Sequence, residues 1–206
     1  MKILIGTPIH QVKDYSMERW LENVAKLQQE YPADFLMVDN SPGLSYVEKV
    51  KEYCAKYGII NYKIEHLELP MEQEVFERVA RSREIIRQEV LSKDYDAWFS
   101  WECDQLIPTN SLGILVDIIK SGNFEIVEVN SWAREIPDEP NTDGGVALFK
   151  RELLEKYSFI LEPSTVPYLP KDWELGEARY RKRAVKDGGG YVKVYGVITP
   201  IYHLDR

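Results

Sequence analysis

The sequence predicts an α/β fold in which helices flank a central, mostly parallel mixed sheet. Through the first half of the chain, short apolar runs alternate with amphipathic stretches, which is the pattern of strand–helix–strand units. Each apolar run ends in polar or turn-forming residues, as expected where a strand leaves a sheet. A chain of 206 residues with no internal repeat, low-complexity segment or long linker indicates a single domain over residues 1–206.

The first half is expected to supply most of the sheet and the helices that cover it. Strands are expected at residues 2–6, 35–38, 62–67 and 97–101, and helices at residues 16–30, 45–57, 73–92 and from about residue 109. In the first helix, Trp20, Val24 and Leu27 recur at helical spacing, and Ser16 can cap the start. Pro32 follows the end of this helix, where the chain must leave the helical path.

The second half shows a weaker pattern. Strands are expected at residues 124–129, 145–149 and 191–201, a charged helix at residues 171–186, and an irregular loop at residues 163–170. The three glycines that follow the charged helix are expected to end it.

The composition excludes several classes of protein. The formal net charge is −8, whereas proteins that track a nucleic-acid backbone carry an excess of Lys and Arg, so we expect no nucleic-acid partner. Cys54 and Cys103 are too few for a disulfide framework and wrongly spaced for a zinc site. The apolar run at residues 2–6 is shorter than that of a signal peptide, and no run approaches membrane-spanning length. We therefore expect a cytoplasmic protein without a transmembrane segment.

Polar residues follow the expected strands, and they mark the edge of the sheet where ligands bind. In open parallel sheets, this edge is formed by the carboxyl ends of the strands, and we call it the carboxyl edge. Thr7 and Pro8 follow the first expected strand, Asp39 follows the second, and Glu102 and Asp104 follow the fourth. An acidic edge of this kind suits a cation or a ribose.

Glu102 and Asp104 have the spacing of a cation site. Residues two apart on an extended chain point the same way, so both carboxylates can face one ligand. Mg²⁺ and Mn²⁺ prefer one or two carboxylates together with phosphate oxygens. The alternative is a solvated loop that contains two acids, and the spacing alone leaves that alternative open.

A series of short motifs occurs in a fixed order along the chain. The motifs are Thr7-Pro8, Asp39-Asn40-Ser41, Ala80-Arg81-Ser82-Arg83, the run from Asp94 to Phe99 before Glu102-Cys103-Asp104, then Asp143-Gly144-Gly145, Lys171-Asp172-Trp173-Glu174-Leu175 and His203. In this order they resemble the family-2-like glycosyltransferases of the GT-A fold, the nucleotide-diphospho-sugar transferase superfamily. The resemblance covers nearly the whole chain.

The resemblance implies a nucleotide-binding half at residues 1–107 and an acceptor-binding half at residues 108–206. It implies that Thr7, Pro8 and Asp39 line the pocket for the base and ribose. Glu102 and Asp104 stand where the family has its Asp-any-Asp motif. Asp104 would then hold Mg²⁺ or Mn²⁺, with Glu102 at the ribose and the metal.

Three further residues acquire roles from the resemblance. His203 would complete the metal or diphosphate site, although a lone histidine is also a common structural residue. Arg81 and Arg83 lie two apart on the expected helix and do not share a face. The family pattern favours Arg83 for the diphosphate, which leaves Arg81 as a surface charge.

The transfer reaction needs a base for the acceptor hydroxyl. The resemblance assigns this role to Asp172, with Glu174 in reserve, while capping of a helix by Asp172 is the structural alternative. Trp173 would contact the acceptor. Gly144 and Gly145 would bring backbone close to the donor sugar, or else form a simple turn.

The function implied by the resemblance is transfer of a sugar from a UDP- or GDP-sugar to a hydroxyl of a glycan, protein or lipid-linked acceptor, with inversion. A homodimer is a possible assembly. A sugar-phosphate nucleotidyltransferase is an alternative, but it normally opens with a glycine-rich phosphate loop, and residues 7–13 contain no glycine. A nucleotide-sugar binding module without turnover is the other alternative, because Glu102 and Cys103 depart from the family motif.

Overall fold

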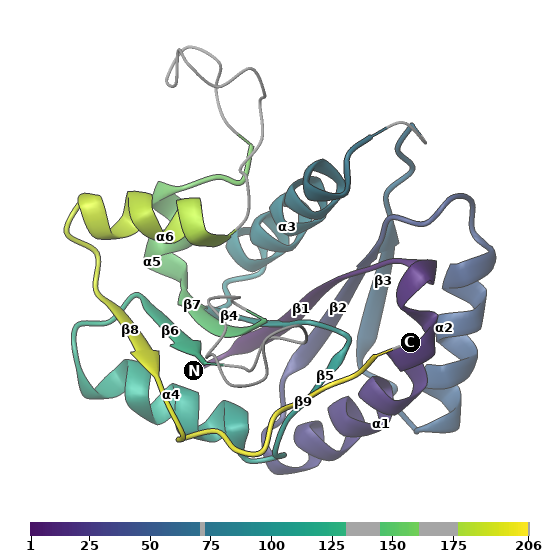
Figure 1. Cartoon of the computed structure of the whole chain (residues 1–206), viewed down its shortest axis with the longest axis horizontal. Coiled ribbons are helices and arrows are strands. Elements are labelled where there is room, and N and C mark those ends of the chain that lie inside the picture. Colours follow the sequence, from purple (N-terminus) through teal and green to yellow (C-terminus); the bar gives the residue numbers. More distant parts are fainter. Residues whose placement is uncertain (71–72, 131–144, 161–176, 206) are drawn as a thin grey trace.

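The computed structural model of the chain describes residues 1–70, 73–130, 145–160 and 177–205. In these residues a seven-stranded mixed sheet runs through the molecule with helices on both faces (Figure 1), which confirms the predicted α/β fold. The strand order is β3-β2-β1-β4-β7-β6-β8. The bounds are β1 Ile3–Ile9, β2 Asp34–Asp39, β3 Tyr62–His66, β4 Ala97–Trp101, β6 Ile126–Val129, β7 Val146–Lys150 and β8 Tyr191–Val194.

The sheet is parallel in its first half and mixed in its second. Strands β3, β2, β1 and β4 are mutually parallel, so their carboxyl ends meet at one edge. Strand β7 pairs antiparallel with both β4 and β6, and β8 runs parallel to β6. The sequence therefore predicts the parallel half correctly, and the single reversed strand β7 makes the sheet mixed.

Helices cover the two faces of the sheet with separate apolar cores. One face is covered by α1 Asp14–Glu30, α2 Ser45–Lys56 and α4 Ser111–Ser121, and the other by α3 Val75–Ser92, α5 Arg151–Lys156 and α6 Glu177–Lys186. Trp20 and Leu115 lie in the first core, and Ile86 and Leu153 lie in the second. Each helix buries its apolar stripe against the sheet, which is why the helical spacing was readable in the sequence.

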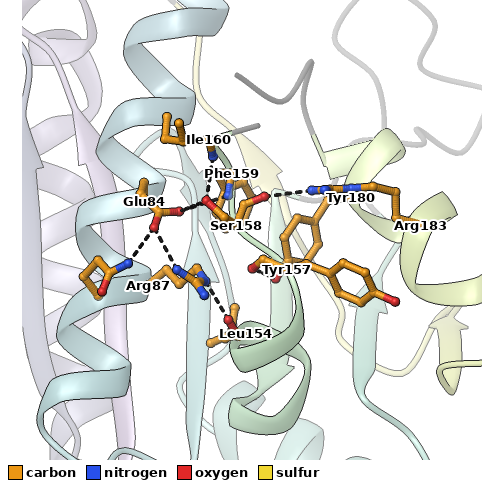
Figure 2. Close-up of polar contacts among 10 residues, drawn as sticks. Glu84, Arg87, Leu154, Tyr157, Ser158, Phe159, Ile160, Tyr180 and Arg183 are labelled. Carbon is orange, nitrogen blue, oxygen red and sulfur yellow. Dashed lines mark hydrogen bonds and ion pairs between the residues drawn. The ribbon is translucent and has the colours of Figure 1, made fainter. Parts of the chain in front are cut away.

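A network of polar contacts joins α3 to the segment between α5 and α6 (Figure 2). Glu84 Oε2 accepts hydrogen bonds from Ser158 Oγ and from the backbone N–H of Phe159, both at 2.9 Å. Arg87 donates to the carbonyl of Leu154 at 2.5 Å, and Arg183 of α6 donates to the carbonyl of Ser158 at 2.8 Å. The network fixes α5 and α6 against the same helix that carries Arg83 to the carboxyl edge.

The first strand and the first helix differ from the predicted bounds. Strand β1 continues to Ile9, so Thr7 and Pro8 lie within it rather than after it. β1 pairs with β4 only as far as Gly6. Beyond Gly6 this side of β1 is not paired with β4, so Pro8, which has no backbone N–H, is tolerated there. Helix α1 begins at Asp14, after a short 3₁₀ helix η1 at Gln11–Lys13, and Ser16 is therefore not its cap.

Short elements escaped the sequence analysis. The two-residue strand β5, Gln105–Leu106, pairs with β9, Tyr202–His203, and α5 has only six residues. None is long enough to show a periodic pattern. The strand expected at residues 191–201 ends as β8 at Val194, because Gly196 follows with a left-handed φ of +66° and turns the chain away. The loop expected at residues 163–170 and the start of the helix expected at 171 lie outside the described residues.

No helix of the described segments is both long and apolar enough to cross a membrane.

Candidate functional site

A pocket of about 450 Å³ lies at the carboxyl edge, between η1, the ends of β1 and β4, and the first turns of α3. Its apolar wall comprises Pro8, Ile9, Val12, Val75, Phe76 and Val79. Its polar groups are His10, Lys13, Asn40, Arg78, Arg83, Ser100 and Glu102. A hollow with one apolar wall and several cationic groups suits a ligand that combines a flat ring with negative charge.

Three potential metal ligands converge beside this pocket. Glu102, Asp104 and His203 each offer one ligand atom, and these atoms lie within 4.8 Å of one another. Glu102 and Asp104 follow β4 directly. His203 arrives from almost one hundred residues later because β9 pairs with β5, which places His203 opposite Gln105. The backbone N–H of Leu204 also donates to the carbonyl of Asp104 at 2.7 Å.

The Asp104 carboxylate lies at the centre of this group. Its side chain is fully buried, and Oδ2 forms an ion pair with Lys13 Nζ. Tyr15 OH donates to the same oxygen at 3.3 Å, and His203 Nε2 lies 3.6 Å from it. Burial alone would raise the pKa of Asp104, but His203 and Lys13 outweigh burial and hold this pKa well below its usual range. Asp104 is therefore an anion at neutral pH.

This donor set fits a hard divalent cation. Two carboxylates and an imidazole are ligands that Mn²⁺ accepts, and Mg²⁺ favours the carboxylates. Three protein ligands leave coordination positions for oxygens of a phosphate. Glu102 also lines the pocket, so a cation held here would touch a ligand bound in the pocket.

Arg83 adds a buried positive charge to the lining of the pocket. Its side chain extends from α3, and the residue is only 7% exposed. Burial lowers the pKa of Arg83 to about 10, and the negative charge of Glu102 opposes this shift, so the guanidinium stays charged at neutral pH. Arg81 instead forms an ion pair with Glu77 at 2.7 Å along the helix surface. The two arginines point in different directions, as their spacing predicts.

The residues expected around the base and ribose occupy three different positions. Pro8 lines the pocket. Thr7 is buried, and its hydroxyl donates to the carbonyl of Trp101 at 2.8 Å, which ties β1 to the end of β4. Asp39 is also buried, and Oδ1 accepts hydrogen bonds from the Ser41 hydroxyl at 2.6 Å and the Ser41 N–H at 3.1 Å.

Two residues that the sequence analysis did not single out belong to this region. His66 Nδ1 lies 2.9 Å from Asp39 Oδ2, because the register of β2 and β3 sets the two residues side by side. Lys13 pairs with Asp104 from η1. His66 ends the third strand, so the rule that polar residues after strands mark the site could have found it. Lys13 lies on an element too short to show a pattern.

The glycines and the expected base fall elsewhere. The Glu102 N–H donates to the carbonyl of Gly145 at 2.8 Å, and a Cβ on Gly145 would lie 2.1 Å from the Gln105 side chain. Gly145 therefore allows close packing against Gln105 and does not line the pocket. Gly144, Asp172, Trp173 and Glu174 lie outside the described residues.

The architecture is that of a GT-A-type fold, the fold of nucleotide-sugar glycosyltransferases. The sequence matches no family model and no curated protein. Solved structures do match this chain. Their sequence identities to it are so low that the likeness shows the fold alone.

Three solved structures illustrate the similarity. A mannosyltransferase from Pyrobaculum calidifontis in complex with GDP-Man and Mn²⁺ matches with a TM-score of 0.69 and 15% identity over 95% of this chain and 55% of that one. S. aureus TarS 1-349 in complex with UDP matches with a TM-score of 0.62 and 13% identity over 94% of this chain and 61% of that one. A mycobacterial protein matches with a TM-score of 0.61 and 12% identity over 100% of this chain and 68% of that one. The chain thus spans little more than half the length of the first two.

Proposed function

We propose that the chain is a metal-dependent glycosyltransferase that moves a sugar from a UDP- or GDP-sugar to an acceptor hydroxyl. The observation that carries the proposal is the convergence of Glu102, Asp104 and His203 beside a pocket that contains the buried Arg83. The GT-A-type fold and neighbours solved with GDP-Man and Mn²⁺ or with UDP support it.

Glu102, Asp104 and His203 would hold Mg²⁺ or Mn²⁺ at the carboxyl edge. Such an ion, when bound, neutralises charge that develops on a departing diphosphate. Arg83 contributes a second, fixed positive charge, and a guanidinium donates two parallel hydrogen bonds to phosphate oxygens. The apolar wall around Pro8 and Phe76 offers a surface for the nucleotide base. The hydrogen bonds of Thr7 and Asp39 fix the ends of β1 and β2, which lead to this wall.

The group transfer itself needs a base, and we assign that role to Asp172, with Glu174 as the reserve. The carboxylate takes the proton of the acceptor hydroxyl, whose oxygen then forms a bond to the anomeric carbon. The bond from that carbon to the diphosphate oxygen breaks at the same time, and the nucleoside diphosphate leaves with the electron pair. Attack opposite the leaving group inverts the anomeric centre. Trp173 would lie against the acceptor, and Gly144 near the donor sugar.

We assign nucleotide binding and acceptor binding to different halves of the chain. Among the residues that the structure describes, those that line the pocket fall within residues 1–107, which supports a nucleotide-binding half. Residues 108–206 would bind the acceptor, and they also contribute His203 to the metal site.

The test is release of nucleoside diphosphate from a panel of UDP- and GDP-sugars with Mn²⁺ or Mg²⁺. Asp104→Asn should lower kcat/KM at least a hundredfold, because it removes the anionic ligand at the centre of the site. The control is Asp117→Asn on the exposed surface of α4, which should retain activity. Full activity in Asp104→Asn would refute the metal assignment.

Two further measurements separate the alternative functions. A nucleotidyltransferase would release pyrophosphate from a nucleoside triphosphate and a sugar 1-phosphate, and no nucleoside diphosphate from the sugar donors. A binding module would show donor binding by calorimetry and no turnover with either metal.

A further inference from the structure

One amino group already touches the carboxylate that would hold the metal. Lys13 ends η1, and its ammonium group forms an ion pair with Asp104 Oδ2. The Asp104 side chain has no exposed surface, whereas the Lys13 side chain is 36% exposed. Lys13 also lines the pocket. The ammonium therefore reaches the buried carboxylate from the pocket side, which is the side from which a ligand would enter.

The Lys13 ammonium is drawn to both carboxylates that would hold the metal. Burial would lower the pKa of Lys13, but the hydrogen bond and charge of Asp104 outweigh burial and raise it. Glu102 lies close enough to act on the same ammonium in the same direction. Both candidate carboxylate ligands therefore attract Lys13, and the group stays charged at neutral pH.

An ammonium group and a divalent cation cannot share Asp104 Oδ2 at low cost. Both must lie within contact distance of the oxygen, and two positive charges so close together repel strongly in a buried site. The His203 imidazole lies 3.6 Å from the same oxygen and fills another direction of approach. Whichever oxygen of Asp104 the cation binds, it would lie close to the ammonium, and the two positive charges would compete for this one buried carboxylate.

The charges of the carboxylates and of a bound diphosphate indicate what the displaced ammonium would bind. Lys13 brings one positive charge to a pair of carboxylates, Glu102 and Asp104, whereas a divalent cation brings two. That cation balances both carboxylates and frees the charge of Lys13. The freed ammonium would remain at the wall of the pocket that Arg83 also lines, where a diphosphate would add negative charge.

We propose that Lys13 is an internal counter-ion that competes with the divalent cation for Asp104, and that the cation displaces it towards the diphosphate of the donor. The proposed function supplies the donor in this inference. Lys13 then makes metal binding weak without nucleotide and strong with it. By reciprocity, the metal strengthens nucleotide binding by the same factor.

The first experiment measures Mn²⁺ binding without nucleotide, from the electron paramagnetic resonance signal of free Mn²⁺. Lys13→Met should bind Mn²⁺ at least tenfold more tightly than the wild type, because the Lys13 ammonium no longer competes for Asp104. Lys13→Arg keeps the charge and should bind Mn²⁺ within about threefold of the wild type.

Lys49→Met is the matched control. Lys49 forms an exposed ion pair with Asp14 at 2.5 Å. Asp14 is the residue that follows Lys13 in the chain. This variant has the same change of net charge and should bind Mn²⁺ within about twofold of the wild type. If Lys49→Met gained as much Mn²⁺ affinity as Lys13→Met, the gain would be a general effect of net charge, and the inference would be overturned.

A second measurement tests the displacement. Addition of GDP or UDP should tighten Mn²⁺ binding by the wild type, and by a clearly smaller factor in Lys13→Met, which has no ammonium to offer the diphosphate. Equal tightening in both proteins would contradict this step. Thermal unfolding checks that Lys13→Met is folded, and Mn²⁺ should raise its melting temperature more than that of the wild type.

Asp104→Asn separates failure of the inference from failure of the proposed function. If Lys13→Met and the wild type bind Mn²⁺ equally while Asp104→Asn has lost Mn²⁺, the metal site stands and only the inference is wrong. If Asp104→Asn also binds Mn²⁺ like the wild type, the inference and the metal assignment fail together.

Discussion

At the scale of single residues, two buried carboxylates at the carboxyl edge have different surroundings. The oxygens of Asp39 contact Ser41 and His66, which are both fixed by the sheet and the turn that follows it. Asp104 contacts Tyr15, His203 and the ammonium of Lys13, whose side chain is 36% exposed. A partly exposed lysine can move away from a carboxylate and leave its place to a ligand, whereas partners fixed by the sheet hold their positions. The local contacts therefore point to Asp104, and not Asp39, as the carboxylate that binds a cation.

Arg83 gives the sharpest test of the diphosphate site. Arg83→Gln removes a charged hydrogen-bond donor from the pocket, and such bonds contribute about 1.5–3 kcal/mol. We expect kcat/KM for the sugar donor to fall about 10- to 100-fold, measured by steady-state release of nucleoside diphosphate.

Arg81→Gln is the internal control for this prediction. Arg81 lies two residues away on the same helix and pairs with Glu77 at the surface, so the variant should stay within about threefold of the wild type. A larger loss in Arg81→Gln than in Arg83→Gln would show that the wrong arginine has been assigned to the diphosphate.

The sequence identified the individual residues of the site better than their surroundings. Glu102, Asp104 and His203 were predicted as ligands, and the structure brings them together. His66 ends a strand, where the rule for polar residues could have found it, but its partner Asp39 follows only from the register of β2 and β3, which local sequence does not encode. Lys13 was missed because its partner Asp104 lies 91 positions away.

At the scale of elements, α3 is the helix on which the site depends. It carries Arg83 to the pocket, and Glu84 on the next position binds Ser158 and Phe159 between α5 and α6 (Figure 2). Adjacent positions on a helix point about 100° apart, so one helix can serve the pocket and the packing of α5 and α6 together. Any shift of α3 relative to the sheet would move both.

Gly6 sets how closely α3 approaches the sheet. A Cβ at this position would lie 2.3 Å from Cγ2 of Ile86 on α3 and 2.6 Å from Nε1 of Trp98. Trp98 Nε1 also donates to the Gly6 carbonyl at 2.9 Å, so its ring has little freedom to move. Gly6→Ala should reduce the free energy of unfolding by about 1–3 kcal/mol, the usual cost of an overpacked core, as measured by urea denaturation.

Gly113→Ala is the control for this packing argument. Gly113 lies inside α4, and a Cβ there would meet only Tyr31, at an ordinary contact distance of 3.9 Å. Alanine is favoured over glycine within helices, so this variant should be neutral or stabilising by up to about 1 kcal/mol. Gly6→Ala as stable as Gly113→Ala would contradict the close approach of α3.

The elements that the sequence predicted are those with a full apolar pattern. Strand β4 matches its expected bounds because all of its residues are buried, and α2 differs only at its last residue because it buries one continuous face. The failures are β5, β9 and α5, which have two, two and six residues. Their positions depend on partners elsewhere in the chain, and this dependence leaves no local signature.

At the scale of the whole molecule, the site joins the middle of the chain to residue 203. The large sheet holds β4 in place through β1 and β7, whereas in the described residues His203 reaches Asp104 through the separate pairing of β5 with β9 and the hydrogen bond from Leu204. Closing this long loop has an entropic cost, which these contacts help to offset. A cation bound by Glu102, Asp104 and His203 would add a further cross-link between the halves.

Metal binding should therefore stabilise the folded chain as a whole, and His203 should carry part of the effect. At a Mn²⁺ concentration of about 100 times Kd, binding stabilises the native state by about 2.7 kcal/mol, which corresponds to a rise in melting temperature of roughly 5–10 °C for a domain of this size. Addition of EDTA should reverse the rise. At the same Mn²⁺ concentration, His203→Ala should show less than half of it, because one of three ligands is lost.

Tyr202→Ala is the matched control for His203→Ala. Tyr202 is the other residue of β9, and it is 59% exposed, so its removal keeps the strand and the imidazole. The Mn²⁺-induced rise should stay at the wild-type value in this variant. If His203→Ala retained the full rise, β9 would only cover Asp104 through the hydrogen bond of Leu204, and the metal would be held by Glu102 and Asp104 without it. A loss in both variants would instead show that the pairing of β9, and not the imidazole, is what the metal requires.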